Sequence, residues 1–391
     1  MPTGRDYDVV VFGATGFTGE LTAQYLARNA PARLRWALAG RNRDKLEAVR
    51  LRLAAIDPVL AEMDLLIADV NDEDSVRAVA EATRVVVTTV GPYITYGDAL
   101  VGACAAAGTD YVDLTGEPEF VDQTWLRHHS RAVESGARLV HCCGFDSIPY
   151  DLGVHLTVQH LPEGAPIKVE GFVQAGGTFS GGTFHSAITA FGRMRSAARL
   201  AARRRKEESR PSGRKVRGVP MRPTREDSLG LWGLPAPTVD PQVVLRSARA
   251  LERYGPEFTY GHYIGFKRLP AMVGLAGGVG ALFAMAQLPP VRDWLLGRVS
   301  PGDGPSAEKR ERSWFRARFI GVGGGKRVLT EVSGGDPGYE ETAKMLAESA
   351  LCLAFDSLPA SSGQVTTAVA MGDALTERLI KAGIRFDVTE A

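Results

Sequence analysis

The chain has 391 residues, of which 45% are hydrophobic, and its formal net charge at pH 7 is +1. This length favours about two domains, each with enough apolar material for its own core, and a charge so close to zero excludes a general attraction to nucleic acid or to membranes. Four cysteines without metal-ligand spacing predict reduced thiols and no metal site.

The first predicted elements are a strand over residues 7–12 and a helix over 17–29. A glycine-rich loop leads from the strand into the helix; its residues are Gly13, Ala14, Thr15, Gly16, Phe17, Thr18 and Gly19. At such a turn Gly13 permits the bend, Gly16 leaves room for a diphosphate, and Gly19 allows the helix to pack closely on the strand. Because the positive end of the helix then faces an anion, we predict a dinucleotide site here.

The second predicted strand, over residues 34–40, ends at Arg41. A site that prefers NAD is expected to place Asp or Glu there, where it holds the ribose 2′-hydroxyl. A guanidinium instead binds a 2′-phosphate through a forked, charge-assisted pair, so NADP(H) is the predicted cofactor. The alternative is that Arg41 is a solvated residue at a helix start, since Asn42 and Asp44 are also suitable caps.

Helices and strands then alternate to about residue 145, which predicts right-handed crossovers and a parallel, doubly wound sheet of the α/β class. Further helices are predicted over 44–55, 74–82, 98–107 and 119–135. Further strands are predicted over 65–68, 85–90, 111–114 and 138–141. We assign residues 1–150 to a nucleotide-binding domain.

Ligands of such sheets lie beyond the carboxyl ends of the strands. Asp69 is expected either to accept a hydrogen bond from the adenine amino group or to cap the next helix. Gly91 and Pro92 offer close backbone approach near the nicotinamide ribose, and Tyr93 and Tyr96 are the aromatic residues expected to bound the ring.

Three more carboxylates, those of Asp113, Glu117 and Asp146, follow strands that end at the same edge. Each of them, taken singly, is better interpreted as an anchor for loop amides than as an acid or base.

Residues 151–391 are predicted to form a mixed α+β domain for substrate binding or dimerisation. Helices are predicted over 151–159, 182–205, 339–355 and 366–382. Strands are predicted over 167–175, 258–266, 314–321 and 326–332. The last two form a hairpin through three glycines, and this hairpin is a candidate for closing a sheet between two copies in a homodimer.

A basic segment over residues 193–225 contains thirteen Lys or Arg and two Glu, a local excess of eleven positive charges. It can dock an acidic protein or anionic lipid headgroups, or it can be a solvated face followed by a loop. Nucleic acid is disfavoured because the segment has no aromatic residue to stack on bases.

An apolar segment over residues 269–291 carries no charged side chain. Its glycines and its final proline pair weaken a bilayer-spanning helix, so a lid over an acyl chain or a segment lying on a membrane surface is preferred. Since the chain enters its first strand without a charged-then-apolar leader, we expect a cytoplasmic protein with peripheral contact to the inner face of the cell membrane.

Several motifs together resemble the saccharopine dehydrogenase-like oxidoreductases and, more narrowly, the trans-acting enoyl reductases of actinobacterial lipid synthesis. The motifs are the glycine-rich loop, Ala39-Gly40-Arg41, Val90-Gly91-Pro92-Tyr93, Tyr111 to Glu117, Gly144 to Pro149, Ser180 to Thr183 and Ala370 to Leu375. The resemblance implies an NADP-binding Rossmann domain, a mixed α/β domain, and last helices that pack back on the first domain. In the narrower group it implies reduction of an enoyl double bond on a lipid chain whose synthase module lacks its own reductase.

The expected reaction is hydride transfer to the β-carbon of an enoyl thioester and protonation of the α-carbon, helped by a donor to the enolate oxygen. Candidate donors are Tyr93, Tyr96 and Ser147, together with His185 for the proton. Two alternatives stay open: an imine or ketone reductase of a smaller, saccharopine-like metabolite, and a non-catalytic NADP(H)-binding sensor or assembly protein.

Overall fold

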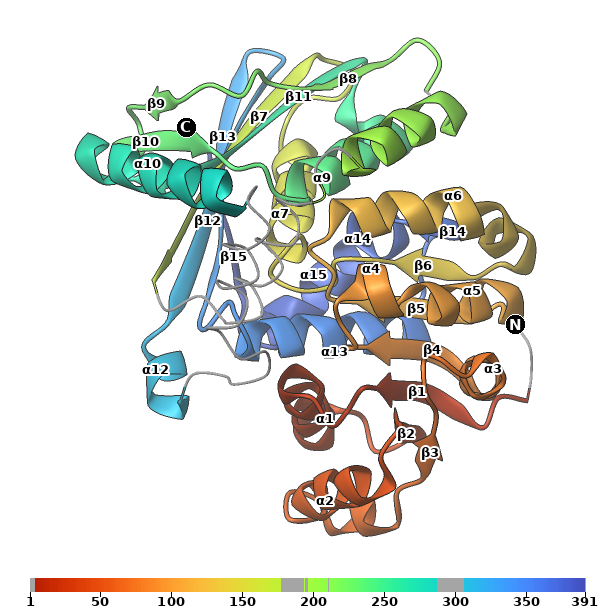
Figure 1. Ribbon diagram of the computed structural model, residues 1–391. Helices are drawn as coiled ribbons and strands as arrows, with labels where there is room; N and C mark the ends of the chain where they lie inside the picture. Colours follow the sequence, from red (N-terminus) through yellow and green to blue (C-terminus); the bar gives the residue numbers. More distant parts are fainter. Residues whose placement is uncertain (1–3, 177–192, 194–195, 210, 287–305, 391) are drawn as a thin grey trace. The chain divides into compact units, whose positions relative to one another are not determined.

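The computed structural model describes residues 4–176, 193, 196–209, 211–286 and 306–390 (Figure 1). The chain forms two compact units. The first consists of Met1–Ile148 and Tyr339–Ala382, and the second of Pro149–Gly338 and Gly383–Ala391.

The first unit is built on a seven-stranded sheet in which every neighbouring pair of strands is parallel. In spatial order its strands are β14 (Gly363–Val365), β6 (Arg138–Val140), β5 (Asp110–Asp113), β4 (Thr83–Thr88), β1 (Tyr7–Phe12), β2 (Trp36–Gly40) and β3 (Leu65–Ile67). From β1 the chain runs outward to β2 and β3 and then returns to β4 on the other side. In sheets of this topology ligands bind at the carboxyl ends of the two strands that flank the reversal, here β1 and β4, and the predicted doubly wound sheet is confirmed.

Two helical layers cover the two faces of the sheet. Successive side chains of β1 point to opposite faces, so this strand contributes to the core under each layer. Val10 and Phe12 belong to the core under α3 (Glu73–Ala82), α5 (Asp98–Ala107) and α6 (Pro118–Ser135). Val11 belongs to the opposite core, under α1 (Phe17–Asn29), α2 (Arg43–Ala54) and α13 (Glu340–Phe355). Burial on both faces explains the uninterrupted apolar run in this strand.

Residues 339–382 complete the first unit although they follow the whole of the second in sequence. α13 packs on α1, and β14 extends the sheet beyond β6. The single helix predicted over 366–382 is wrong: α14 (Thr367–Ala370) and α15 (Gly372–Lys381) are separated at Met371, and Gly372, the first residue of α15, has φ +46°. The remaining helices of this unit are η1 (Pro58–Glu62) and α4 (Tyr93–Tyr96).

The second unit is built on an eight-stranded sheet that is mostly antiparallel. Its strands run in the order β15 (Arg385–Glu390), β13 (Lys326–Gly334), β12 (Trp314–Gly323), β7 (Ile167–Gly176), β11 (Glu257–Phe266), β10 (Leu231–Pro235) and β9 (Thr224–Glu226), with β8 (Lys215–Gly218) paired to β11. Its labelled helices are α7 (Ile148–Gln159), α9 (Asp240–Ala250), η2 (Glu252–Tyr254), α10 (Leu269–Ala286) and α12 (Ala307–Glu311), and residues 196–207 are helical as well.

The predicted hairpin is present as β12 and β13, and its turn uses the positive φ of Gly324 and Gly325. Both of its outer edges are paired within this chain, β12 with β7 and β13 with β15. The hairpin therefore has no free edge through which to extend the sheet into a second copy, and the sequence-based expectation of such an extension is wrong.

The basic segment is more structured than a solvated loop. Residues 196–207 are helical, and β8 and β9 follow. Arg204 is 3% exposed and pairs with Glu208 at 2.9 Å, while Arg214 donates to the backbone carbonyls of Ala248, Leu251 and Gly255 at the end of α9 and just beyond it. Arg199 and Lys206 are exposed and have no ion pair within the described residues.

The apolar segment forms α10 as far as Ala286, and its last five residues lie outside the described part of the chain. Val273 is 59% exposed and Val279 is 42% exposed, whereas Met272 is buried. A methyl group added at the four glycines of this helix would meet no atom within 4 Å. None of the helices in the described ranges combines the length and apolarity that a bilayer crossing requires.

Candidate cofactor site

The glycine-rich loop lies at the carboxyl end of β1 and turns directly into α1. Gly13 has φ +87°, and its amide donates to the Ala39 carbonyl of β2 at 2.9 Å. The Gly16 amide donates back to the Gly13 carbonyl at 3.0 Å, which closes the turn. Gly19 faces the same carbonyl so closely that a Cβ there would lie 2.3 Å from the oxygen.

Gly16 differs from the other two glycines, because a Cβ on this residue would have only an ordinary 3.5 Å contact with the Gly13 oxygen. Packing within the chain therefore does not require glycine at this position. Thr15 and Gly16 are exposed, and no side chain caps the N-terminus of α1 at Gly16. An open cradle at the positive end of a helix fits a diphosphate.

The rest of the predicted loop has supporting roles. Ala14 is buried in the core under α1, and the Thr18 carbonyl accepts a hydrogen bond from the Thr22 hydroxyl at 2.8 Å. Phe17 packs edge-on against Tyr339, with ring centroids 4.8 Å apart. These contacts hold the loop in place while its tip stays open.

Arg41 follows β2 and precedes α2. Asn42 is the N-cap of that helix, since its side chain accepts the Lys45 amide at 2.9 Å. Arg41 therefore lies outside the helix, and its exposed guanidinium makes no ion pair within the described residues. The guanidinium of nearby Arg43 pairs with the Glu47 carboxylate, with 4.0 Å between Nη1 and Oε1. The charge at the end of β2 is thus available for a phosphate.

Asp69 stabilises its own loop, because its carboxylate accepts the Asn71 backbone and side-chain amides at 2.9 Å each. Asp72, rather than Asp69, caps α3. Of the two roles considered for Asp69, the helix cap is therefore wrong, and the adenine contact stays a proposal.

The loop after β4 lies beside the glycine-rich loop. The Thr89 amide donates a hydrogen bond to the Phe12 carbonyl at 3.1 Å, and the Thr89 hydroxyl donates one to the Gly13 carbonyl at 3.2 Å. Gly91 and Pro92 follow, both exposed. Tyr93 is buried, and its hydroxyl donates to the Thr88 carbonyl and accepts the Leu114 amide, both at 3.2 Å. Burial also raises the Tyr93 pKa. Its two hydrogen bonds give this hydroxyl a structural role in the loops after β4 and β5.

Asp113 and Glu117 are fully engaged at the next strand. Asp113 accepts the amides of Thr115 and Cys142 and lies 2.6 Å from His141 Nδ1. The two oxygens of Glu117 accept the first two amides of α4 at 2.9 Å each. The prediction that these two carboxylates anchor loop amides is confirmed.

Asp146, in the loop after β6, has a different environment. Its side chain is exposed and makes no hydrogen bond or ion pair to any described residue. Its Oδ2 would lie 3.4 Å from a Cβ placed on exposed Gly116. Although water reaches the carboxylate, surrounding protein desolvates it and raises its pKa to about 6. The sequence-based interpretation of Asp146 as an anchor is wrong, and only the three-dimensional contacts reveal this.

The remaining candidates differ in accessibility. Tyr96 is 41% exposed at the end of α4, whereas Ser147 is buried and its hydroxyl donates to the Asp146 backbone carbonyl. His185 and the motif Ser180 to Thr183 lie outside the described residues. In the described part of the chain, no group of three or more His, Cys, Asp or Glu side chains is arranged to hold a metal.

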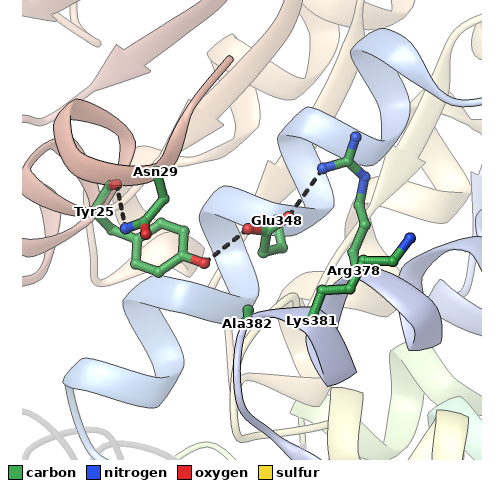
Figure 2. A pocket seen from close by; sticks show the side chains of 6 residues that line it. All are labelled: Tyr25, Asn29, Glu348, Arg378, Lys381 and Ala382. Carbon is green, nitrogen blue, oxygen red and sulfur yellow. Dashed lines mark hydrogen bonds and ion pairs between the residues drawn. The ribbon is translucent and has the colours of Figure 1, made fainter.

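A pocket of about 220 Å³ lies elsewhere in the first unit, at the far end of α1 from the glycine-rich loop (Figure 2). Tyr25 of α1 donates to Glu348 of α13 at 2.7 Å, and Arg378 of α15 donates to the same carboxylate at 3.1 Å. Burial and Glu348 raise the Tyr25 pKa. These bonds join the returning segment to α1, which gives the pocket wall a structural role.

Comparisons with known proteins agree with this geometry. The model of the saccharopine dehydrogenase NADP-binding domain matches residues 9–140. NADP(H) is therefore the cofactor of this domain, and the open glycine-rich loop and the exposed Arg41 are compatible with it. Across the whole chain, saccharopine dehydrogenase (L-Glu forming) from Saccharomyces cerevisiae has the same fold, with TM-score 0.59 at 12% identity, covering 98% of this chain and 100% of that one.

Two mycobacterial relatives are more similar in sequence. A Mycobacterium tuberculosis H37Rv protein, provisionally named a trans-acting enoyl reductase, is 39% identical over 417 residues, covering 99% of this chain and 98% of its own. A protein of Mycobacterium ulcerans named trans-acting enoyl reductase is 35% identical over 422 residues, covering 98% of each. The chain therefore belongs to the saccharopine dehydrogenase-like oxidoreductases and, within them, to the family of trans-acting enoyl reductases.

Proposed function

We propose that this protein is an NADPH-dependent reductase of the carbon–carbon double bond in an enoyl thioester. The observation that carries the proposal is an open glycine-rich loop beside an exposed Arg41 that has no ion pair among the described residues. The chain that holds them is 35–39% identical, over nearly its whole length, to proteins whose names give this activity. NADPH, when bound, supplies the hydride that the β-carbon of the substrate receives.

The residues at the carboxyl edge of the first sheet have separate tasks in this reaction. The glycine-rich loop binds the diphosphate, and Arg41 binds the 2′-phosphate. Gly91 and Pro92 allow close approach of the ligand at the end of β4. Tyr96 is the exposed hydroxyl that can donate to the enolate oxygen as negative charge develops there. Tyr93 and Ser147, whose hydroxyls already have partners, position the loops around it.

We propose a lipid or polyketide acyl chain as the substrate, presented on an acidic carrier protein. The basic segment supports this partner, because Arg199 and Lys206 expose positive charge that an acidic surface can approach. Buried Arg204 is excluded from the contact and stabilises the fold instead.

We also propose peripheral contact between α10 and the inner face of a membrane. This helix exposes apolar side chains next to exposed Lys267 and Arg268, a combination that suits an anionic lipid surface. Such a contact would place the enzyme where long acyl chains are made.

The activity is tested by following NADPH oxidation with purified protein and trans-2-octenoyl pantetheine. Mass spectrometry should find the octanoyl product two hydrogens heavier than the substrate. A cyclic imine and a 2-oxo acid serve as comparison substrates. Turnover of these alone would point to a saccharopine-like reductase, and tight NADPH binding without turnover of any of them would point to a sensor.

A further inference from the structure

The acid that completes the proposed reaction can be sought among the polar side chains at the carboxyl edge of the first sheet. Once the β-carbon has received its hydride, the electron pair of the broken π bond lies on the enolate. A new bond between the α-carbon and a proton then completes the saturated thioester. The donor must be protonated during turnover, accessible to substrate, and not committed to another partner.

Most polar groups at this edge fail the last requirement. The carboxylates of Asp113 and Glu117 each accept two backbone amides. The Tyr93 hydroxyl lies between a carbonyl and an amide, and the Ser147 hydroxyl donates to a carbonyl. Using any of these groups as an acid would break contacts that fold the loops.

Asp146 meets the requirement of accessibility and has no competing partner. Its carboxylate is exposed and unpartnered within the described residues, and it lies against Gly116, which is also exposed. It thus stands at the ends of β5 and β6, the strands that follow β4 in the sheet. This is the edge at which ligands of doubly wound sheets bind.

The loop that carries Asp146 is held on both sides. The Cys143 amide donates to the Asp113 carbonyl at 2.7 Å, and the Phe145 amide donates to the Thr342 hydroxyl of α13 at 3.1 Å. Cys142 has φ +63°, a conformation that is uncommon for a residue other than glycine and that is often found at functional sites. Gly144 packs so tightly that a Cβ would lie 2.8 Å from Leu114. The backbone that carries Asp146 is therefore held in place at the edge of the sheet.

We propose that Asp146 is the acid that protonates the α-carbon, an inference that rests on the proposed enoyl reductase function. The proton leaves the Asp146 carboxyl and forms the C–H bond with the electron pair of the enolate. The resulting carboxylate recovers a proton from water, which reaches the exposed side chain.

The surrounding charges are consistent with this role. Burial is the main cause of the raised Tyr93 pKa, and the negative charges of Asp113, Glu117 and Asp146 raise it further. On α13, which contacts the loop through Thr342, Glu341 and Lys344 pair with each other at 2.7 Å. Desolvation raises the Asp146 pKa to about 6, so about a tenth of the molecules carry the proton at pH 7.

The test compares wild type with Asp146→Asn, Asp146→Glu and Tyr96→Phe, using trans-2-octenoyl pantetheine and NADPH between pH 5 and 8. Asp6→Asn is the matched control, because Asp6 is exposed just before β1, at the amino edge of the same sheet. We expect kcat of wild type to fall about tenfold per pH unit above pH 6, since the protonated form acts. Asp146→Asn should lose about 100-fold or more in kcat and the pH dependence, with unchanged NADPH affinity.

Asp146→Glu should recover part of kcat together with its fall above pH 6, and the Tyr96 and Asp6 variants should keep that fall. An infrared difference spectrum between wild type and Asp146→Asn should show a carboxyl band that titrates near pH 6. Retained pH dependence in Asp146→Asn, or a band that titrates near pH 4, would overturn the assignment while leaving the enoyl reductase intact. Failure of wild type to reduce the octenoyl thioester would instead overturn the function, and the role of Asp146 with it.

Discussion

A methyl group on Gly19 would lie 2.3 Å from the carbonyl oxygen of Gly13, so the first turn of α1 and the end of β1 are in direct backbone contact. No side chain can be accommodated between them without moving the helix. The contact fixes the direction in which the helix N-terminus points, and this direction determines where an anion can bind.

Two alanine substitutions in the loop should therefore have different effects. Gly19→Ala should destabilise the protein by about 3 kcal/mol, because the new methyl group overlaps fixed backbone. Gly16→Ala should cost less than about 1 kcal/mol, since its methyl group has room within the chain. It should nevertheless weaken NADPH binding at least about tenfold, because that room is needed by the diphosphate. Urea unfolding and calorimetric titration measure the two effects, and full NADPH affinity in Gly16→Ala would contradict this view of the cradle.

Arg41 should determine the choice between phosphorylated and unphosphorylated cofactor. Charge-assisted hydrogen bonds contribute about 1.5–3 kcal/mol, so Arg41→Ala should weaken NADPH binding about 10- to 150-fold and leave NADH binding unchanged. Arg41→Asp should favour NADH further by repelling the phosphate. Arg43→Ala is the control, because Arg43 faces Glu47 on α2. An equal loss of affinity for both cofactors in Arg41→Ala would show that the guanidinium does not contact the 2′-phosphate.

The basic segment should affect substrates that arrive on a protein more than free thioesters. Reversing the exposed charges of Arg199 and Lys206 to Glu should lower kcat/KM for an acyl carrier protein substrate about tenfold, mostly at low salt. The same substrate on pantetheine should react normally. Arg77 and Arg131 of the first unit, exposed by 60% and 61%, are matched sites for a control double reversal. Equal losses with both substrates would argue against docking.

Arg204→Glu belongs to a separate experiment, because this residue is buried beside Glu208. Reversal would bring two carboxylates together out of water, and we expect it to destabilise the protein by about 3–5 kcal/mol. Thermal unfolding measures this loss of stability as a lower Tm of Arg204→Glu than of wild type.

The raised pKa of Asp146 should make wild type less stable as pH rises from about 4 to 6. Over this interval the folded state holds a proton that the unfolded state, with the ordinary pKa of 3.8, has already released. The stability of the folded state that depends on the protonated Asp146 carboxyl is therefore fully present below pH 4, and it is lost as the pH rises through the folded pKa. Asp146→Asn has no such charge to desolvate, so its Tm should exceed that of wild type at pH 8 by more than at pH 4. The same difference in Tm at both pH values would contradict the shift.

The exposed apolar surface of α10 should bind lipid. In sedimentation with vesicles of 30% phosphatidylserine and 70% phosphatidylcholine, wild type should pellet, and Val273→Asp with Val279→Asp should not. Leu51 and Val59, exposed by 71% and 79% in the first unit, are matched positions for a control pair of Asp substitutions. If the control pair abolished binding equally, the contact would not lie on α10.

Local signals in the sequence were sufficient for the start of the fold. The first strand and helix have the predicted bounds, Tyr7–Phe12 and Phe17–Asn29, because a buried β-branched run, glycines and a helical apolar face occur in immediate succession. By contrast, β14 has three residues and pairs with a strand more than 200 positions earlier. No local pattern identifies such a strand, since its stability comes from its neighbour.

Strands β8 and β9 were missed for a related reason. They lie in and at the end of the basic segment and are rich in charged residues, as in Lys215-Val216-Arg217 and Arg225-Glu226. β9 is also an edge strand, where charged side chains are common and mask the strand signal.

The candidate site was only partly predictable. The loop and Arg41 occupy the positions that the motif implies, because spacing along the chain sets both. The carboxylates at the strand ends looked alike in sequence, and what distinguishes them is which backbone amides reach each one. Glu117 accepts the amides of the first turn of α4, and Asp113 accepts amides after β5 and β6. No amide in the described ranges reaches the Asp146 carboxylate.

The chain passes from one unit to the other at 148/149, 338/339 and 382/383. A polypeptide cut after residue 150 would lack α13, and the apolar surface that Ala347 and Leu351 cover over β1 and α1 would be bared to water. Excising the nucleotide-binding half for separate expression should therefore give an aggregating fragment. Fusing residue 148 to residue 339 through a short linker should give a soluble one that can still be saturated with NADPH.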